Sequence, residues 1–151
     1  MNLSLGEPFR LFYQSGNEHD VRDSFGLIVL AIDGNFGVAI DQRARNGMIE
    51  NHWSGSTDRG VVERVLSHLQ AAGYPTVPDH KIPRGARLRS IAIESGTDST
   101  HTYPTEWTAV NAMPGYREAY QLLDSIVMQV TAGALKMRVD PVDEIVGRAA
   151  S

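Results

Sequence analysis

Two apolar runs that flank a tight turn constrain the fold of this chain most strongly. Residues 25–32 and 36–41 are rich in β-forming types, and Asp33-Gly34-Asn35 separates them. Gly and Asn tolerate the positive φ that short hairpin turns require, so we expect two antiparallel strands here. A strand at 9–13 before them, and another at 48–53 after Asn46-Gly47, extend the prediction to an antiparallel meander of three or four strands.

Two later segments have helical spacing. The first, at about residues 58–72, follows residues typical of helix N-caps and ends at Gly73, where a left-handed cap is expected. The second runs from Pro114-Gly115 to Gly133. Its apolar residues recur at steps of three and four, which predicts a helix packed against the core; they are Tyr116, Tyr120, Leu123, Val127 and Val130.

Between the helices, the sequence predicts a second hairpin. Residues 87–94 alternate apolar and polar side chains, and residues 101–110 form the expected return strand after the polar segment 95–100. We therefore expect an α+β fold, in which an antiparallel sheet, made of the meander plus the later hairpin, is packed by two main helices. At 151 residues the chain is the size of one domain, which we place at residues 1–133, with a C-terminal extension at 134–151.

Composition excludes several classes of function. The chain has no cysteine, which removes disulfide scaffolds and thiolate metal sites, and its net charge of -4 does not favour nucleic acid as a partner. Its longest strongly apolar run, residues 25–32, is shorter than a membrane helix, and the amino terminus has no positively charged leader. We expect no membrane association and a cytoplasmic location.

Local motifs give little support to catalysis or cofactor binding. Residues 33–37 lack the glycine spacing of a phosphate loop, and Ser54-Gly55-Ser56 and Ser95-Gly96 read as serine–glycine turns without a nucleophile elbow. The acidic segment Glu18-His19-Asp20, with Asp23, has metal-ligating residue types but is typical of a solvated loop. We expect no metal and no cofactor.

The segment around Pro104 is the best candidate for recognition. Proline lacks a ladder donor and marks a sheet edge or a bulge, while Tyr103 and Trp107 offer large contact areas with few torsions to freeze. We predict that Tyr103, Glu106 and Trp107 contact a protein partner. The alternative is that the two rings are buried in the core.

In outline, residues 9–130 resemble small bacterial inhibitor and immunity-type proteins, in particular the emfourin-like inhibitors of metalloproteases. The matching segments are the strand into Tyr13-Gln14-Ser15-Gly16, the helix into Ala71-Ala72-Gly73-Tyr74-Pro75, the later hairpin, and the closing helix with Leu122-Leu123. The resemblance implies a protein that inhibits or regulates a partner through its surface.

We therefore expect a non-enzymatic protein-binding module, either an inhibitor or an immunity-like regulatory protein. One alternative is a small enzyme whose site is assembled from distant residues, such as His52, Glu94, His101 and Glu106. The other is the subunit of a homo-oligomer, joined by an edge strand or by the C-terminal extension.

Overall fold

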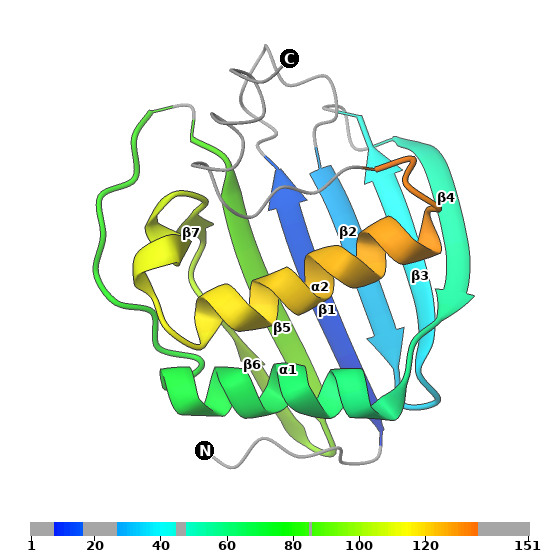
Figure 1. Cartoon of the computed structure of the whole chain (residues 1–151), viewed down its shortest axis with the longest axis horizontal. Coiled ribbons are helices and arrows are strands. Elements are labelled where there is room, and N and C mark those ends of the chain that lie inside the picture. Colours follow the sequence, from blue (N-terminus) through cyan, green and yellow to red (C-terminus); the bar gives the residue numbers. More distant parts are fainter. Residues whose placement is uncertain (1–7, 17–26, 45–47, 85, 136–151) are drawn as a thin grey trace.

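The part of the chain that the structure describes forms one open antiparallel sheet with two α-helices packed on one of its faces (Figure 1). The computed structural model describes residues 8–16, 27–44, 48–84 and 86–135. The predicted α+β class, with an antiparallel sheet and two main helices, is confirmed.

The elements follow in the order strands, helix, strands, helix. They are β1 (Phe9–Gly16), β2 (Leu27–Asp33), β3 (Gly37–Arg43), β4 (Ile49–Ser56), α1 (Arg59–Ala72), β5 (Leu88–Ser95), β6 (Asp98–His101), β7 (Thr105–Glu106), a 3₁₀ turn (Ala109–Ala112) and α2 (Tyr116–Val130). The strand order is β4-β3-β2-β1-β5-β6, and β7 also pairs with β5.

The meander β1 to β4 joins the later hairpin through the first strand. β1 pairs with β2 on one side and with β5 on the other, from Phe9 opposite Ser95 to Gly16 opposite Leu88. This long-range pairing places β1 at the centre of the sheet, and every one of its neighbours is antiparallel.

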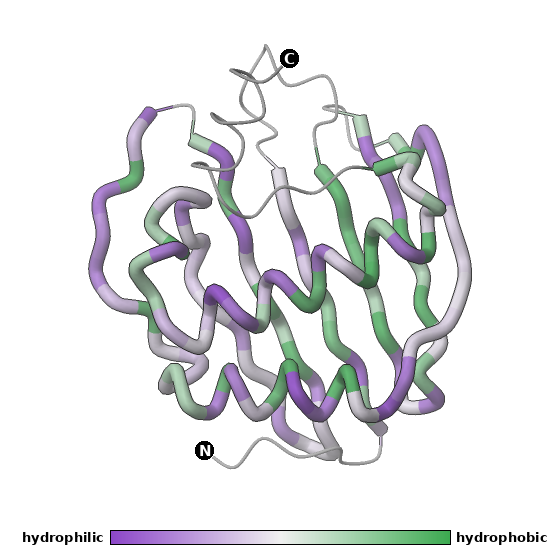
Figure 2. Tube along the Cα trace, viewed as in Figure 1, coloured by the Kyte–Doolittle hydropathy of each residue, from purple (hydrophilic) through white to green (hydrophobic). Residues whose placement is uncertain are grey.

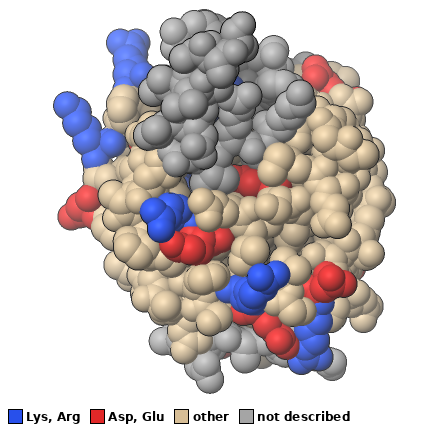
Figure 3. Space-filling model, in the orientation of Figure 1, with Lys and Arg blue, Asp and Glu red and all other residues tan. Residues whose placement is uncertain are grey.

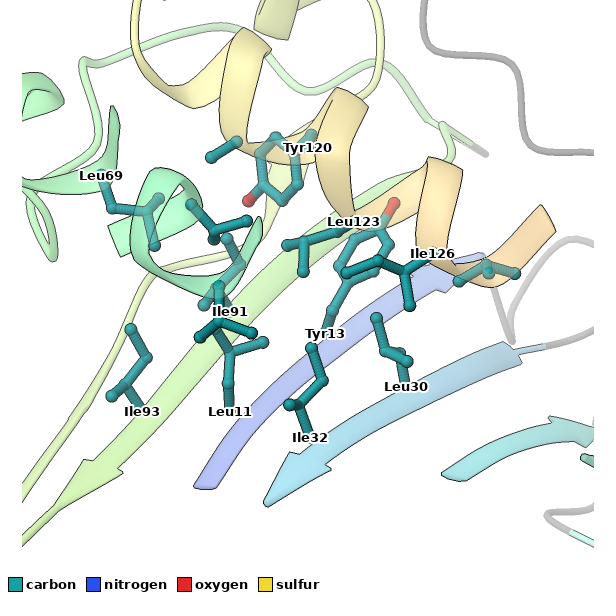
Figure 4. Packing of buried hydrophobic residues seen from close by; sticks show 14 of the residues in the cluster. Leu11, Tyr13, Leu30, Ile32, Leu69, Ile91, Ile93, Tyr120, Leu123 and Ile126 are labelled. Atoms are coloured by element: carbon teal, nitrogen blue, oxygen red, sulfur yellow. The ribbon is translucent and has the colours of Figure 1, made fainter. Parts of the chain in front are cut away.

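Buried and more exposed residues alternate along the strands and so lie on opposite faces of the sheet. Hydrophobic residues make up much of these strands (Figure 2). In β1 the odd-numbered residues Phe9, Leu11 and Tyr13 are buried beneath the helices, whereas Arg10 and Gln14 are exposed on the opposite face. The same period of two holds in β2, β3 and β5. Figure 4 shows these inward side chains meeting residues of the helices, among them Leu69, Tyr120, Leu123 and Ile126.

The helices lie side by side and run in opposite directions across the strands (Figure 1). α1 ends at Gly73, whose φ of 88° is the left-handed cap expected from the sequence. α2 begins after Gly115, and the Glu118 carboxylate accepts a hydrogen bond from the Gly115 N–H at 2.6 Å.

The predicted second hairpin is confirmed, but its return strand begins earlier and is shorter than the predicted residues 101–110. The chain turns immediately after β5, with Gly96 at a φ of 62°, so the returning strand β6 (Asp98–His101) begins inside the segment 95–100 that was expected to be a loop. Pro104 cannot donate to a ladder, and beyond it only Thr105 and Glu106 pair with β5 before the 3₁₀ turn. The predicted turn at Asn46-Gly47 and the extension after residue 135 lie outside the described residues.

Candidate functional site

The sheet has one covered face and one open face. α1 and α2 pack on the same side, and no other helix of the described residues covers the opposite side (Figure 1). Register places Phe12 between Ala31 and Ala92, and Ala31 beside Ala39, so these four side chains form an apolar centre on the open face. All four are half-buried.

Charged and polar residues surround this apolar centre. Arg10, Asp33 and Glu94 lie toward one end of the open face, and Asp41 and His52 lie toward β4. An apolar centre inside a polar rim is the arrangement found in protein–protein interfaces.

The open face is hollowed where small residues meet. A depression of about 380 Å³ lies over Ala31, Gly37 and Ala39, with Phe12 and Arg10 at its side. Asp33 closes one end, where its carboxylate accepts hydrogen bonds from the N–H groups of Asn35 (2.9 Å) and Gly37 (3.0 Å) in the β2–β3 turn. The depression exists because neither alanine nor glycine fills the space above the sheet.

A hydrogen-bonded array of Asp41, His52 and Ser54 stands next to this depression. His52 and Ser54 project from the same face of β4, and His52 pairs with Asp41 across the β3–β4 ladder. The His52 Nδ1 atom lies 2.6 Å from Asp41 Oδ1, and His52 Nε2 lies 3.2 Å from Ser54 Oγ. Arg43 contacts the other oxygen of Asp41 at 3.5 Å.

The sequence did not reveal this array. We interpreted Ser54 as part of a serine–glycine turn, but the structure places it inside β4, where a period of two puts it on the same face as His52. Asp41 was not considered, because its position opposite His52 depends on the register of β3 against β4. The available signal was the spacing His52-x-Ser54, which puts both side chains on one face of a strand, together with Asp41 on the preceding strand.

The residues predicted to contact a partner fall into different environments. Tyr103 is 80 % exposed, whereas Trp107 is 8 % exposed and packs in the core. Glu106 is also buried, and its carboxylate accepts hydrogen bonds from the Ala109 N–H at 2.8 Å and from the Thr108 hydroxyl. Of these three side chains, Tyr103 alone is presented to solvent.

Trp107 covers a buried ion pair. The Arg89 guanidinium lies 3.8 Å from the centre of the Trp107 ring and donates to Asp124 at 3.1 Å, and both charged side chains are fully buried. The Tyr13 hydroxyl donates to the other Asp124 oxygen at 2.6 Å, which ties β1 to α2. Burial raises the pKa of Asp124 above its ordinary value, and the neighbouring Arg89 opposes that rise. This network is part of the core beneath the helices.

The four residues suggested for a distant catalytic site do not converge. Glu94 and His101 project from the open face at the β5–β6 edge, whereas His52 lies on β4 at the opposite edge of the sheet. Glu106 pairs opposite Leu88, six positions along β5 from Glu94, so the two carboxylates do not form a glycosidase pair. Of the four, His52 contacts Asp41 and Ser54, whereas the Glu106 carboxylate bonds only to its chain neighbours Thr108 and Ala109 among the described residues.

The helix face carries evenly mixed charge (Figure 3). Each exposed ion pair on this face joins two residues of the same helix. Arg59 contacts Glu63 at 2.7 Å on α1, and Arg117 contacts Glu118 at 2.9 Å on α2. Such pairs are typical of a solvated helix surface. The helix face therefore offers a weaker candidate site than the open face.

Metal clusters and membrane-spanning helices can be assessed only for the residues that the structure describes. Among these residues, His, Asp and Glu side chains nowhere gather in a group of three that could hold a metal, and neither helix has the length and apolar character needed to cross a bilayer. The candidate metal residues Glu18, His19, Asp20 and Asp23 lie outside the described residues.

The described residues thus form a two-layer α+β fold in which no helix covers one face of the sheet. No protein-family model matches the sequence, and no curated protein matches it either.

Proposed function

We propose that this protein is a protein-binding module whose docking surface is the open face of the sheet. The observation that carries the proposal is the half-buried apolar centre of Phe12, Ala31, Ala39 and Ala92, set within a polar rim and left uncovered by both helices.

The depression indicates the chemistry of the partner surface. A volume of about 380 Å³ suits one bulky apolar side chain, which Phe12 would flank from the side. Arg10 and Asp33 carry opposite charges at its border, so a partner presenting an apolar anchor between an acidic and a basic group would be complementary to it.

In its narrower form, the proposal is that the partner is an enzyme or toxin, and that docking inhibits it. The support is the outline resemblance to small bacterial inhibitor and immunity-type proteins. An assay of bacterial metalloproteases on a protein substrate, with and without equimolar protein, tests this form: a stoichiometric loss of proteolysis supports it, and unchanged proteolysis contradicts it.

The position of the docking surface is tested by a matched pair of alanine-to-glutamate variants. Ala31→Glu fills the depression with a charged side chain, whereas Ala71→Glu makes the same change at an exposed position of α1. For a partner captured with the wild-type protein, we expect Ala31→Glu to weaken binding at least tenfold and Ala71→Glu to leave the Kd unchanged. Circular dichroism melts check that both variants fold. Equal affinity of both variants would contradict the open face as docking surface.

A further inference from the structure

The contact between Asp41 and His52 bears on which nitrogen of the neutral His52 ring carries the proton. An ionised carboxylate only accepts hydrogen bonds, so the 2.6 Å contact with Asp41 requires His52 Nδ1 to donate. In the neutral ring the lone pair is then on Nε2, which faces Ser54 Oγ at 3.2 Å. The Ser54 hydroxyl therefore has a base within reach of its proton.

We propose that Ser54 is a nucleophile that accepts an acyl group from activated esters, with His52 as its general base and Asp41 as the residue that positions His52. This inference goes beyond the binding function, and it does not depend on a protein partner. The roles correspond to the general logic of an activated hydroxyl: a nucleophile, a base within hydrogen-bond reach, and an acid that orients the base.

The depression beside Ser54 defines the substrate class. Ala39, which lies opposite Ser54 in the β3–β4 ladder, forms part of the floor of the depression, and Gly55, the residue after Ser54, lines it as well. An acyl chain bound over Ala31 and Ala39 would bring its carbonyl carbon to the β4 side. The depression is shallow and floored by small apolar residues, so it suits a short apolar acyl group.

The outer edge of β4, which pairs with no further strand among the described residues, supplies a donor for the developing oxyanion. The Thr57 N–H donates to the Phe36 carbonyl at 2.9 Å, which makes this pair a hydrogen-bonded pair of the β3–β4 ladder. Hydrogen-bonded and non-hydrogen-bonded pairs alternate, so Val38–Gly55 is hydrogen-bonded and Ala39–Ser54 is not. The Ser54 N–H consequently points away from β3 toward the open edge, beside its own hydroxyl.

The proposed reaction balances with water as the second substrate. Ser54 Oγ forms a bond to the ester carbonyl carbon while its proton moves to His52 Nε2. The carbon–oxygen bond to the leaving alcohol then breaks, and the alcohol takes the proton from His52. Water attacks the acyl-serine, with His52 again accepting its proton, and the acid is released as the serine hydroxyl is restored.

Labelling with a fluorophosphonate tests the nucleophile directly. The reagent would form an Oγ–phosphorus bond at Ser54 with loss of fluoride, and intact-mass and peptide mass spectrometry would locate it. The matched control is Ser56, which lies two residues further along β4, is exposed, and has no histidine in hydrogen-bond contact among the described residues. We expect labelling in wild type and Ser56→Ala, and none in Ser54→Ala.

Hydrolysis of p-nitrophenyl butyrate tests the base. We expect His52→Ala to slow both hydrolysis and fluorophosphonate labelling by about 100-fold, the lower end of the usual contribution of a general base. All three side chains project from the open face, and circular dichroism melts establish that each variant folds. Labelling at Ser56, or equal rates in wild type, Ser54→Ala and His52→Ala, would overturn the proposal.

The role of Asp41 has its own signature. In a long-range ¹H–¹⁵N spectrum, the wild-type His52 ring should be the Nδ1–H tautomer, and Asp41→Asn should shift it toward the Nε2–H form and slow labelling without moving the modified residue. A wild-type ring in the Nε2–H form would overturn the proposed array, because Nε2 would then have no lone pair for the Ser54 proton.

Discussion

At the scale of single residues, register decides which chemical groups meet. Asp41, His52 and Ser54 are ordinary strand residues in the sequence, and their contact arises only because β3 and β4 pair with His52 opposite Asp41. A shift by one residue would move these side chains to the covered face. Ser54 lacks the glycine spacing of a nucleophile elbow, and no local pattern encodes a site assembled across two strands.

The burial of Trp107 also depends on contacts that no local pattern encodes. Trp107 directly follows β7, and the pairing of β7 with β5 brings its ring against the Arg89 guanidinium. We expect Trp107→Ala to lower the free energy of unfolding by about 3–5 kcal/mol, because it removes a buried aromatic ring and uncovers a buried guanidinium. Chemical denaturation measures the change.

Tyr103→Ala is the matched comparison on the same segment. Its ring is 80 % exposed, so we expect a change within about 0.5 kcal/mol. Similar losses in both variants would contradict the different environments of the two rings.

At the scale of elements, the close approach of α1 and α2 depends on a glycine. A side chain at Gly115 would place its Cβ 2.6 Å from the His68 carbonyl oxygen and 2.7 Å from the Ala72 Cβ atom, and Gly115 also has a φ of 88°. We expect Gly115→Ala to destabilise the fold by about 2 kcal/mol or more, as measured by denaturant unfolding.

Gly60, within α1, is the control for this prediction. A Cβ there would have no neighbour within 4 Å, so Gly60→Ala should stabilise the protein by up to about 1 kcal/mol through helix propensity. Equal effects at the two glycines would mean that the helices do not touch as described.

The two helices and the hairpin turn at residues 33–35 were the most predictable elements. The apolar spacing located α1 and α2, and Gly73 located the end of α1, because these signals act over a few neighbouring residues. The strand after β5 was misplaced because Gly96 permits a shorter turn than the polar segment suggested. The β1–β5 pairing involves residues far apart in the chain, and no local signal encodes it.

At the scale of the whole molecule, buried tyrosines link stability to alkaline pH. Burial raises the pKa of Tyr13 and Tyr116 well above their ordinary value, and that of Tyr120 to about 12. Folding therefore favours the protonated hydroxyls, and the unfolded chain loses these protons first as pH rises above about 10. Their contribution is fully present below pH 10.

We expect the free energy of unfolding to fall between pH 10 and 12, by up to about 1.4 kcal/mol per pH unit for each of these tyrosines. Urea unfolding at successive pH values measures the slope. Tyr120→Phe, which removes one of these hydroxyls, should make the slope shallower. A slope that is the same in both proteins, or a stability that rises with pH in this range, would contradict the burial of these rings.

For the molecule as a whole, the proposed binding function requires that the partner docks on the open face of the sheet. Site-specific photo-crosslinking in the cells that make the protein tests it most directly, with p-benzoylphenylalanine placed either at Phe12 on the open face or at Gln70, an exposed position of α1. We expect a discrete protein adduct from position 12 and none from position 70. An adduct from position 70 alone, or from neither position, would contradict docking on the open face.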